Sequence, residues 1–337
     1  MVTDARLLQV IQEAIPLARR PFARIGEQIG WSEEQVMERL RQLKQKPNAV
    51  IRQISAIFDS GSLGYKSTLV AAKVEPSRLE EAAAIISQHP GVSHNYERQH
   101  DYNLWYTLAV PPDSTLGLER TVNELHRQSG AIATRMLPTL KLFKIGVKFD
   151  MGIGEDAPKA PKVEGPKLSV RPLLMADKRI IRVLQRDLPI ITEPFDQWAA
   201  DAGVSMDTLL SLATEYQQRR WMRRFSAVLH HREAGFVANA MGVWAVPADQ
   251  QEAFGKIAAG FPECSHCYLR PSYEDWPYNI FTMVHSKSSE ACEGVLAEIS
   301  RVSGITNYRA LYSTREFKKI RVQYFLDDIP QWESSVG

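Results

Sequence analysis

The chain has 337 residues, of which 44% are apolar and 24% are charged, a composition typical of a globular protein. This length predicts at least two domains, because one hydrophobic core rarely serves more than about 250–300 residues. Its 41 basic and 39 acidic residues give a net charge of +2, which offers no general reason to bind nucleic acid or an anionic membrane. The sequence contains no run of 18 apolar residues, so we expect no membrane-spanning helix.

The cysteines and the first residues indicate a cytoplasmic protein. Cys264, Cys267 and Cys292 are too few for a disulfide scaffold. The N-terminal residues lack the long apolar segment of a signal peptide, so none is expected. Cys264-Ser-His-Cys267 has no second cysteine pair and is not followed by histidine, so we predict no metal site.

The first fifty residues predict a helix-turn-helix unit. Apolar residues recur at the helical period over residues 4–50, and Ser32 stands three residues before Gln35, the spacing of a capping box. Three helices with a short turn before the third are typical of a helix-turn-helix.

Residues 51–150 predict a sheet domain. The sequence predicts strands over residues 51–58, 68–74, 92–96 and 104–110 and an extended segment over 132–149. It predicts helices over residues 76–88 and 114–128. A leading strand followed by β-α-β-β-α-β predicts a ferredoxin-like sheet with helices on one face. The open face and edges of such sheets need cover, and pairing of two sheets, within or between chains, would supply it.

The second half of the chain repeats the first. Residues 4–12 match residues 177–185 at an offset of 173, and His94-x-Tyr96-x-Arg98 matches His266-x-Tyr268-x-Arg270 at 172. We therefore expect a second helix-turn-helix over 173–221, a second ferredoxin-like domain over 222–326 and a C-terminal tail over 327–337. Residues 151–172 are dense in proline and glycine, which predicts an exposed linker. The expected fold class is α+β, a tandem repeat of helix-turn-helix plus ferredoxin-like domain.

This architecture resembles the Lrp/AsnC family of regulators, and several strings are more similar to siroheme decarboxylases. Those strings are His89-Pro-Gly-Val-Ser-His-Asn-Tyr-Glu-Arg-Gln-His100, Tyr102-Asn-Leu-Trp-Tyr-Thr-Leu108, Gly64-Tyr-Lys-Ser-Thr-Leu-Val-Ala71, His231-Arg-x-x-Gly-Phe-x-x-Asn-x-Met241 and Trp276-Pro-Tyr-Asn-Ile-Phe-Thr-Met-Val-His285. In that family two Lrp-like subunits, or a fusion of them, remove carboxyl groups from siroheme on the way to heme d1 or heme.

The resemblance implies a carboxy-lyase that converts acetate side chains of siroheme and yields didecarboxysiroheme. The implied substrate is an iron tetrapyrrole that serves as its own electron sink, so no further cofactor is expected. We expect neither DNA nor membrane as partner. A homodimer is expected, and a paralogous two-repeat subunit is a further conceivable partner. Each half of the chain resembles one of the two subunit types.

Two other functions stay open from the sequence: a transcriptional regulator with a small-molecule sensor domain, and a non-catalytic tetrapyrrole carrier. A regulator needs cations on its reading helix. No Lys or Arg stands between Arg186 and Arg219, whereas six acidic residues do. The third helix of the first unit carries both signs, ending in Arg39, Arg41 and Lys44, an order that also suits the helix dipole. We interpret at least the second unit as a packing module without DNA binding.

His94 and His266 are the candidate catalytic proton donors. Loss of carbon dioxide needs a proton near neutral pH, which histidine supplies. Residues i, i+2 and i+4 of a strand share a face, so each histidine points with its following Tyr96 and Arg98, or Tyr268 and Arg270. Such a row is also typical of a solvated face. His100 extends the first row and is a third catalytic candidate, and residues 271–275 replace its counterpart.

Further residues are candidates for substrate binding. Arginines would clamp carboxylates, and aromatic rings would stack on the macrocycle, although core packing and exposed basic hairpins explain the same residue types. His285 ends an apolar strand and is either structural or a ligand or proton donor. The remaining candidates are Arg223, Arg224, His231, Arg232, Asn239, Trp244, Trp276, Tyr278 and Arg309.

Overall fold

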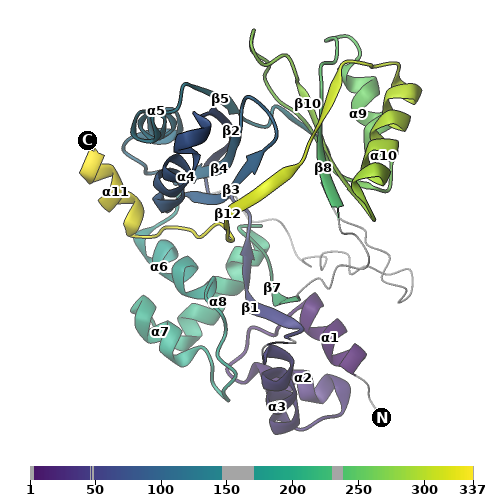
Figure 1. Cartoon of the computed structure of the whole chain (residues 1–337). Helices are drawn as coiled ribbons and strands as arrows, with labels where there is room; N and C mark the ends of the chain where they lie inside the picture. The colour runs from purple at the N-terminus through teal and green to yellow at the C-terminus, as the bar shows by residue number, and fades with distance from the viewer. Residues whose placement is uncertain (1–3, 46, 48, 146–170, 230–237, 337) are drawn as a thin grey trace. The chain divides into compact units, whose positions relative to one another are not determined.

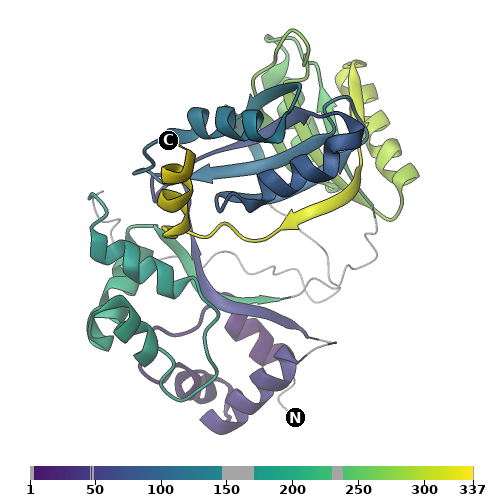
Figure 2. The same ribbon diagram turned by 60° about the vertical axis from the view of Figure 1, so that its left-hand side comes forward.

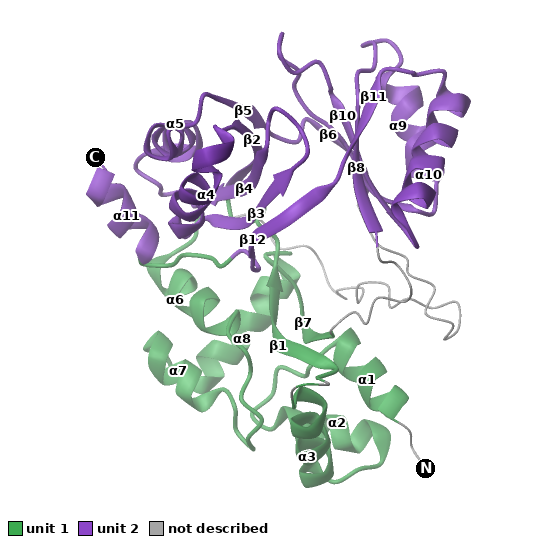
Figure 3. Ribbon diagram, viewed as in Figure 1, with its two compact units in different colours: residues 1–65, 154–232, 323–327 green, residues 66–153, 233–322, 328–337 purple. Residues whose placement is uncertain are grey.

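The structure is a computed structural model that describes residues 4–45, 47, 49–145, 171–229 and 238–336. The chain divides into two compact units, each built from both halves of the sequence (Figures 1 and 3). Unit 1 comprises residues 1–65, 154–232 and 323–327, and unit 2 comprises residues 66–153, 233–322 and 328–337. None of the helices in these described ranges has the length and apolar content needed to cross a bilayer.

Unit 1 contains the two helical triplets. They are α1 (Asp4–Glu13), α2 (Pro21–Ile29) and α3 (Glu33–Lys44), and α6 (Met175–Leu184), α7 (Asp196–Ala202) and α8 (Met206–Gln218). Both bonds of the predicted capping box at Ser32 and Gln35 are present, and Ser205 caps α8 in the same place. Gly30 and Gly203 adopt left-handed backbone at the equivalent turns, which glycine tolerates without a Cβ penalty.

The two leading strands pair with each other. β1 (Ile51–Phe58) and β7 (Met222–Leu229) form an antiparallel ribbon in which Ser55 lies opposite Ser226. This differs from the sequence expectation, which joined each leading strand to the sheet that follows it. Each strand instead packs on the helices of unit 1, β1 on α3 and β7 on α1 and α8, so the ribbon belongs to that unit.

The first sheet of unit 2 has the predicted ferredoxin-like order. Its own elements are β2 (Lys66–Lys73), the 3-10 turn η1 (Pro76–Arg78), α4 (Leu79–Gln88), β3 (Val92–Arg98), β4 (Leu104–Val110), α5 (Gly117–Ser129) and β5 (Ala133–Leu137). The strand order is β12-β3-β4-β2-β5, and its outermost strand, β12 (Ser313–Lys319), comes from the second half of the chain.

The second sheet repeats this arrangement. Its own elements are β8 (Ala238–Trp244), α9 (Gln251–Gly260), β9 (Cys264–Leu269), β10 (Ile280–Ser286), α10 (Ser289–Ser303) and β11 (Tyr308–Leu311). The order is β11-β8-β10-β9-β6, where β6 (Lys141–Ile145) comes from the first half. Each half therefore lends its last strand to the other half's sheet, and the lent β12 is the long yellow strand of Figure 2.

Unit 2 is layered, with helices on the outer faces and the two sheets facing each other. The helices cover one face of each sheet in separate apolar cores. A third core joins the opposite faces and contains no helix residue; its members are Ala71, Tyr102, Trp105, Leu137, Met241, Val243, Trp276, Tyr278, Phe281 and Leu311. We call this group the inter-sheet core. The predicted pairing of two sheets is thus satisfied within one chain.

The segment expected to be a C-terminal tail contains the helix α11 (Asp328–Val336), which packs on the first sheet domain. Trp332 contacts the buried ring of His89 edge-on, with centroids 4.3 Å apart. The carboxylate of Glu333 accepts hydrogen bonds from Thr115 N (2.9 Å), Thr115 Oγ1 (2.6 Å) and Ser114 Oγ, next to the start of α5. Burial raises the pKa of Glu333, but these hydrogen bonds outweigh it and hold the pKa below its usual value.

The first prediction tests the lent strand β6. A Cβ on Gly255 of α9 would lie 2.4 Å from the ring of Phe143 on β6. Alanine normally stabilises a helix interior relative to glycine, yet Gly255→Ala should destabilise the protein by about 1–3 kcal/mol through this overlap. Chemical unfolding measures the change. The matched control is Gly294→Ala in α10, where a Cβ meets nothing within 4 Å, and stability should rise by up to about 1 kcal/mol. Equal behaviour of both variants would contradict this packing.

The second prediction concerns acid stability. Burial lowers the pKa of His89 to about 4 from its ordinary 6.5, the Lys318 ammonium acts in the same direction, and Glu333 opposes both. Between these two pH values the unfolded chain binds more protons than the folded one. The resulting stability is fully present above pH 6.5 and is lost as the pH falls towards 4, by roughly 3 kcal/mol. Urea unfolding should show a flatter acid limb for His89→Gln than for wild type; parallel limbs would refute this assignment.

Candidate active site

The first predicted row lies on the inward face of its sheet. Tyr96 is directly opposite Trp105, a member of the inter-sheet core, so the row shares that face. The rings of His94 and Tyr96 lie 6.1 Å apart, and the guanidinium of Arg98 is 5.9 Å from the Tyr96 ring. The intervening Asn95 points to the helices, where it donates to Ala83 O (3.1 Å) and Ser87 Oγ (3.0 Å). The expected alternation along β3 is therefore observed.

The second row repeats this geometry on β9. Tyr268 is opposite Phe281 of the inter-sheet core. His266 stacks on Tyr268 with centroids 5.9 Å apart, and the guanidinium of Arg270 lies 4.9 Å from the Tyr268 ring. Both rows thus line the faces that the two sheets turn towards each other.

A β-bulge precedes each candidate histidine. The register between β9 and β10 shifts between Val284 and Met283, which leaves Ser265 as the extra residue, and Ser93 has the same place between β3 and β4. A bulge re-aims neighbouring side chains. As a result Ser265 Oγ lies 2.8 Å from His266 Nδ1, and Ser93 Oγ lies 3.0 Å from His94 Nδ1.

The second bulge gathers a second imidazole. His285 Nε2 lies 2.9 Å from Ser265 Oγ, and His285 is paired across the strands with Asn239. The structure therefore brings together three sequence candidates, His266, His285 and Asn239, at one end of β8, β9 and β10. Burial lowers the pKa of His266 and His285, and the proximity of His285 lowers that of His266 further.

The guanidinium Nε atoms of the two row arginines are buried, and neither arginine forms an ion pair with a carboxylate of the described residues. Arg98 donates to the carbonyl of Leu311 at 2.9 Å, and Arg270 donates to the carbonyl of Leu137, so each guanidinium binds the end of the strand that precedes the lent strand of the opposite half. Burial lowers the pKa of both to about 10. The Nε atom of each is buried and has no hydrogen-bond partner among the described residues. A guanidinium has five N–H donors, and a desolvated one is well suited to bind an anionic group from outside the chain.

The strands beside the rows differ in charge. On the first sheet, Glu316 of β12 lies opposite Tyr96. Burial raises the pKa of the Tyr96 phenol to about 12, and the Glu316 carboxylate contributes. On the second sheet, the exposed Leu142 of β6 occupies the position opposite Tyr268. The second row is therefore flanked by the apolar Leu142, and the first by Glu316 together with Lys319, which lies opposite His94 and 3.5 Å from the Glu316 carboxylate.

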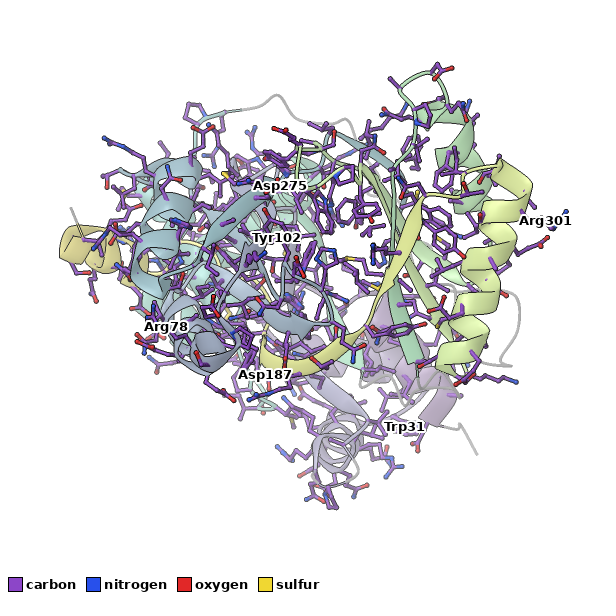
Figure 4. The ribbon with its side chains drawn as sticks, turned by 45° about the horizontal axis from the view of Figure 1, so that its top comes forward. Trp31, Arg78, Tyr102, Asp187, Asp275 and Arg301 are labelled. Carbon is purple, nitrogen blue, oxygen red and sulfur yellow. The ribbon has the colours of Figure 1, made fainter. Side chains whose placement is uncertain are left out.

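His100 lies at the aromatic end of the inter-sheet core, after β3 has ended. Its Nδ1 accepts a hydrogen bond from Tyr102 N at 3.0 Å, and its ring contacts Trp276 edge-on at 5.2 Å. Burial lowers its pKa. The neighbouring Asp275, whose side chain is labelled with that of Tyr102 in Figure 4, binds Arg135 through two bonds of 2.7 and 2.9 Å and accepts from the Tyr102 hydroxyl at 2.7 Å.

The aromatic candidates are mostly covered. Trp244 has no exposed surface and lies in the helix-side core, stacked on Tyr308. This corrects the expectation that Trp244 stacks on the macrocycle, because its ring is on the opposite face of the sheet from His266. Trp276 also has no exposed surface, and Tyr278 accepts a hydrogen bond from Arg309 Nε at 2.8 Å. Trp276 and Tyr278 build the inter-sheet core.

The remaining candidates lie elsewhere. Arg223 and Arg224 are on β7 in unit 1, where Arg223 pairs with Asp59, with its Nε 3.0 Å from the carboxylate. Burial lowers the pKa of Arg224. His231 and Arg232 fall outside the described residues. In the part of the chain that the structure describes, no cluster of three His, Cys, Asp or Glu residues could hold a metal ion.

Sequence reasoning missed Ser265, Asp275 and Leu142. The serine precedes the histidine in both halves, a repeated pair that was a visible signal. Asp275 belongs to residues 271–275, which were noted in the sequence only because they replace the counterpart of His100. Leu142 gave no signal, because only the lent strand brings it beside Tyr268.

The fold and the site define a fused pair of Lrp/AsnC-type subunits whose inward faces carry histidine rows. Residues 62–144 and 233–318 match the protein family described as "AsnC-like ligand binding domain". Residues 4–52 and 177–223 match the family described as "Siroheme decarboxylase NirDL-like HTH domain". The chain belongs to the siroheme decarboxylase family.

Some relatives are similar to almost the whole chain, and others are similar to one half of it. The siroheme decarboxylase of Hydrogenobacter thermophilus is 40% identical over 97% of this chain and 96% of its own length. A siroheme decarboxylase beta subunit of Methanosarcina barkeri is 45% identical over 44% of this chain and 97% of its own length. The crystal structure of the siroheme decarboxylase NirDL in co-complex with an iron-uroporphyrin III analogue superimposes with a TM-score of 0.80 at 34% identity, covering 99% of this chain and 98% of that one.

Proposed function

We propose that this chain is a siroheme decarboxylase that removes carboxyl groups from acetate side chains of siroheme and forms didecarboxysiroheme. The observation that carries the proposal is the similarity over nearly the whole chain to a siroheme decarboxylase, joined to two inward rows that each contain an imidazole, a phenol and a buried guanidinium. The decisive experiment is anaerobic incubation of the purified chain with siroheme, followed by mass analysis for successive losses of carbon dioxide.

The chemistry needs a proton and an electron sink. When an acetate loses carbon dioxide, the electron pair of the broken bond remains on the carbon, and the iron tetrapyrrole ring can accept it. A proton supplied to that carbon completes the reaction. His94 and His266 are suited to this task because an imidazole exchanges protons near neutral pH. Burial lowers the pKa of His266, which makes its imidazolium a stronger acid and less populated.

The arginines fit the recognition of an anionic substrate. Arg98 and Arg270 are desolvated and keep donor atoms that the described residues do not use. A substrate carboxylate would satisfy those donors and relieve the cost of a buried unpaired cation. Holding the carboxylate fringe in this way also orients the reacting acetate, which converts binding into rate.

The helical unit offers little to DNA. Lys44, at the end of α3, pairs with Asp187 at 2.5 Å, and Arg39 pairs with Asp4. Two acidic residues of the second triplet are likewise paired within unit 1, Asp207 with Arg19 at 2.8 Å and Asp201 with Arg186 at 2.5 Å. These ion pairs support a scaffold role for the helices and no DNA partner.

The expected setting and partners remain part of this proposal. The three cysteines are free and buried, as suits a cytoplasmic protein, and no cofactor beyond the substrate's own iron tetrapyrrole is proposed. A homodimer and a paralogous two-repeat subunit stay predictions. Within the single chain β6 and β12 cover the edges of β9 and β3, and β6, β11, β12 and β5 are then the outermost strands of the two sheets.

The third prediction tests the histidines. His266→Ala and His94→Ala should each lower kcat by about 10²–10⁴, because the proton donor is lost, while siroheme still binds. Single-turnover assays measure the rate, and an anaerobic absorbance titration measures binding. Variants that bind and turn over like wild type would refute the assignment.

The fourth prediction tests the buried guanidinium. Arg270→Gln can still donate to the Leu137 carbonyl but loses the charge, so siroheme binding should weaken about 10- to 100-fold, the value of one charge-assisted hydrogen bond. The control is Arg301→Gln on α10, where the side chain is exposed and pairs with Glu298 (Arg301 is labelled in Figure 4). Undiminished affinity in the Arg270 variant would exclude it from substrate binding.

A further inference from the structure

The hydroxyl of Ser265 has three partners, and their chemistry fixes the direction of each hydrogen bond. Its Oγ lies 2.8 Å from His266 Nδ1, 2.9 Å from His285 Nε2 and 3.2 Å from the carbonyl oxygen of Met283. A serine hydroxyl has one hydrogen and two lone pairs. All three contacts are hydrogen bonds only when the carbonyl, which can only accept, takes the hydrogen and both imidazoles donate to the oxygen.

These hydrogen bonds indicate that neutral His266 is the Nδ1–H tautomer. If Nδ1 carries the hydrogen that binds Ser265, the nitrogen that exchanges protons is Nε2. The imidazolium then gives up its Nε2 proton and returns to a neutral form whose Nδ1–H is already held. Among the described residues of this sheet, the other titratable or charged side chains on this face include Tyr268 and Arg270 on β9, His285 on β10 and Arg309 on β11, whereas β6 presents the apolar Leu142.

In the first half, the equivalent serine, Ser93, does not fix the tautomer of His94. Ser93 Oγ lies 3.0 Å from His94 Nδ1 and 2.8 Å from Thr107 Oγ1. A threonine hydroxyl can donate or accept, so the hydrogen on Ser93 can point to either partner and does not fix a tautomer. The two histidines of the repeat are therefore placed differently, although their bulges correspond.

We propose that Ser265 is a positioning residue that holds His266 as the Nδ1–H tautomer, and that the second half of the chain thereby supplies the main proton donor. This inference rests on the proposed decarboxylase function and deepens it. Residues that orient a catalytic imidazole typically change activity strongly when removed, because a ring in the Nε2–H form has no free lone pair at Nε2 to take up the proton that the imidazolium later donates.

The first test needs neither substrate nor variant activity. Long-range ¹H–¹⁵N spectra of ¹⁵N-histidine-labelled wild type distinguish protonated from unprotonated ring nitrogens, and the missing signals of His266→Gln and His285→Gln assign the peaks. At a pH where the ring is neutral, His266 should carry its hydrogen on Nδ1, and Ser265→Ala should give a mixture of tautomers. A wild-type His266 that carries its hydrogen on Nε2 would overturn the proposal.

The second test measures catalysis. Ser265→Ala should lower kcat roughly 10- to 100-fold with little change in KM, and Ser265→Thr, which restores a hydroxyl, should return kcat to within about threefold of wild type. Ser93→Ala is the comparison variant and should cost less. An unchanged kcat in Ser265→Ala, an equal loss in Ser93→Ala, or no rescue by threonine would each overturn the inference.

The failure of this inference is separable from failure of the proposed function. If wild type releases no carbon dioxide from siroheme, the decarboxylase function fails and the catalytic purpose of Ser265 fails with it. If wild type is active and the spectra show the predicted tautomer, but Ser265→Ala retains full kcat, only the positioning role is refuted. Thermal unfolding of each variant separates a kinetic loss from a folding loss.

Discussion

The exchange of last strands is the constraint on which unit 2 depends. An edge strand presents unpaired backbone N–H and C=O groups, and β3 and β9 would each be such an edge without β12 and β6. Because each half satisfies the other's edge, neither sheet is complete alone. The buried guanidiniums of Arg98 and Arg270 reinforce the exchange, since each binds a carbonyl at the end of the strand that leads into the lent one.

The same exchange creates the inward faces on which the candidate site lies. Both sheets cover one face with helices and turn the other inward, where the inter-sheet core fills part of the area and the histidine rows occupy the adjoining strands. Polar and charged side chains are costly on such a face unless something binds them. The two arginines, which have no carboxylate partner in the described part of the chain, are therefore the strongest physical sign of an anionic substrate.

Duplication gave two copies of this arrangement, and small differences separate them. The lent strands place Glu316 beside the first row and Leu142 beside the second, and the second bulge has a carbonyl and a further imidazole where the first has a threonine. The first row thus has the Glu316–Lys319 ion pair beside it, whereas the apolar Leu142 beside the second row suits a flat ring. The chain thus combines two halves that correspond in backbone and differ in chemistry.

Sequence alone determined the duplication, the helix-turn-helix units, the ferredoxin-like order and the shared face of each histidine row, because these follow from local periodicity and from repeated strings. The resemblance of those strings also identified the family. Tertiary structure decided which strands exchange, that the two leading strands pair together, and that Trp244 faces the helices. It also brought Ser265 between His266 and His285. Those outcomes depend on contacts between residues far apart in the chain and on a one-residue bulge, and neither local propensity nor spacing encodes which distant edge a strand will complete.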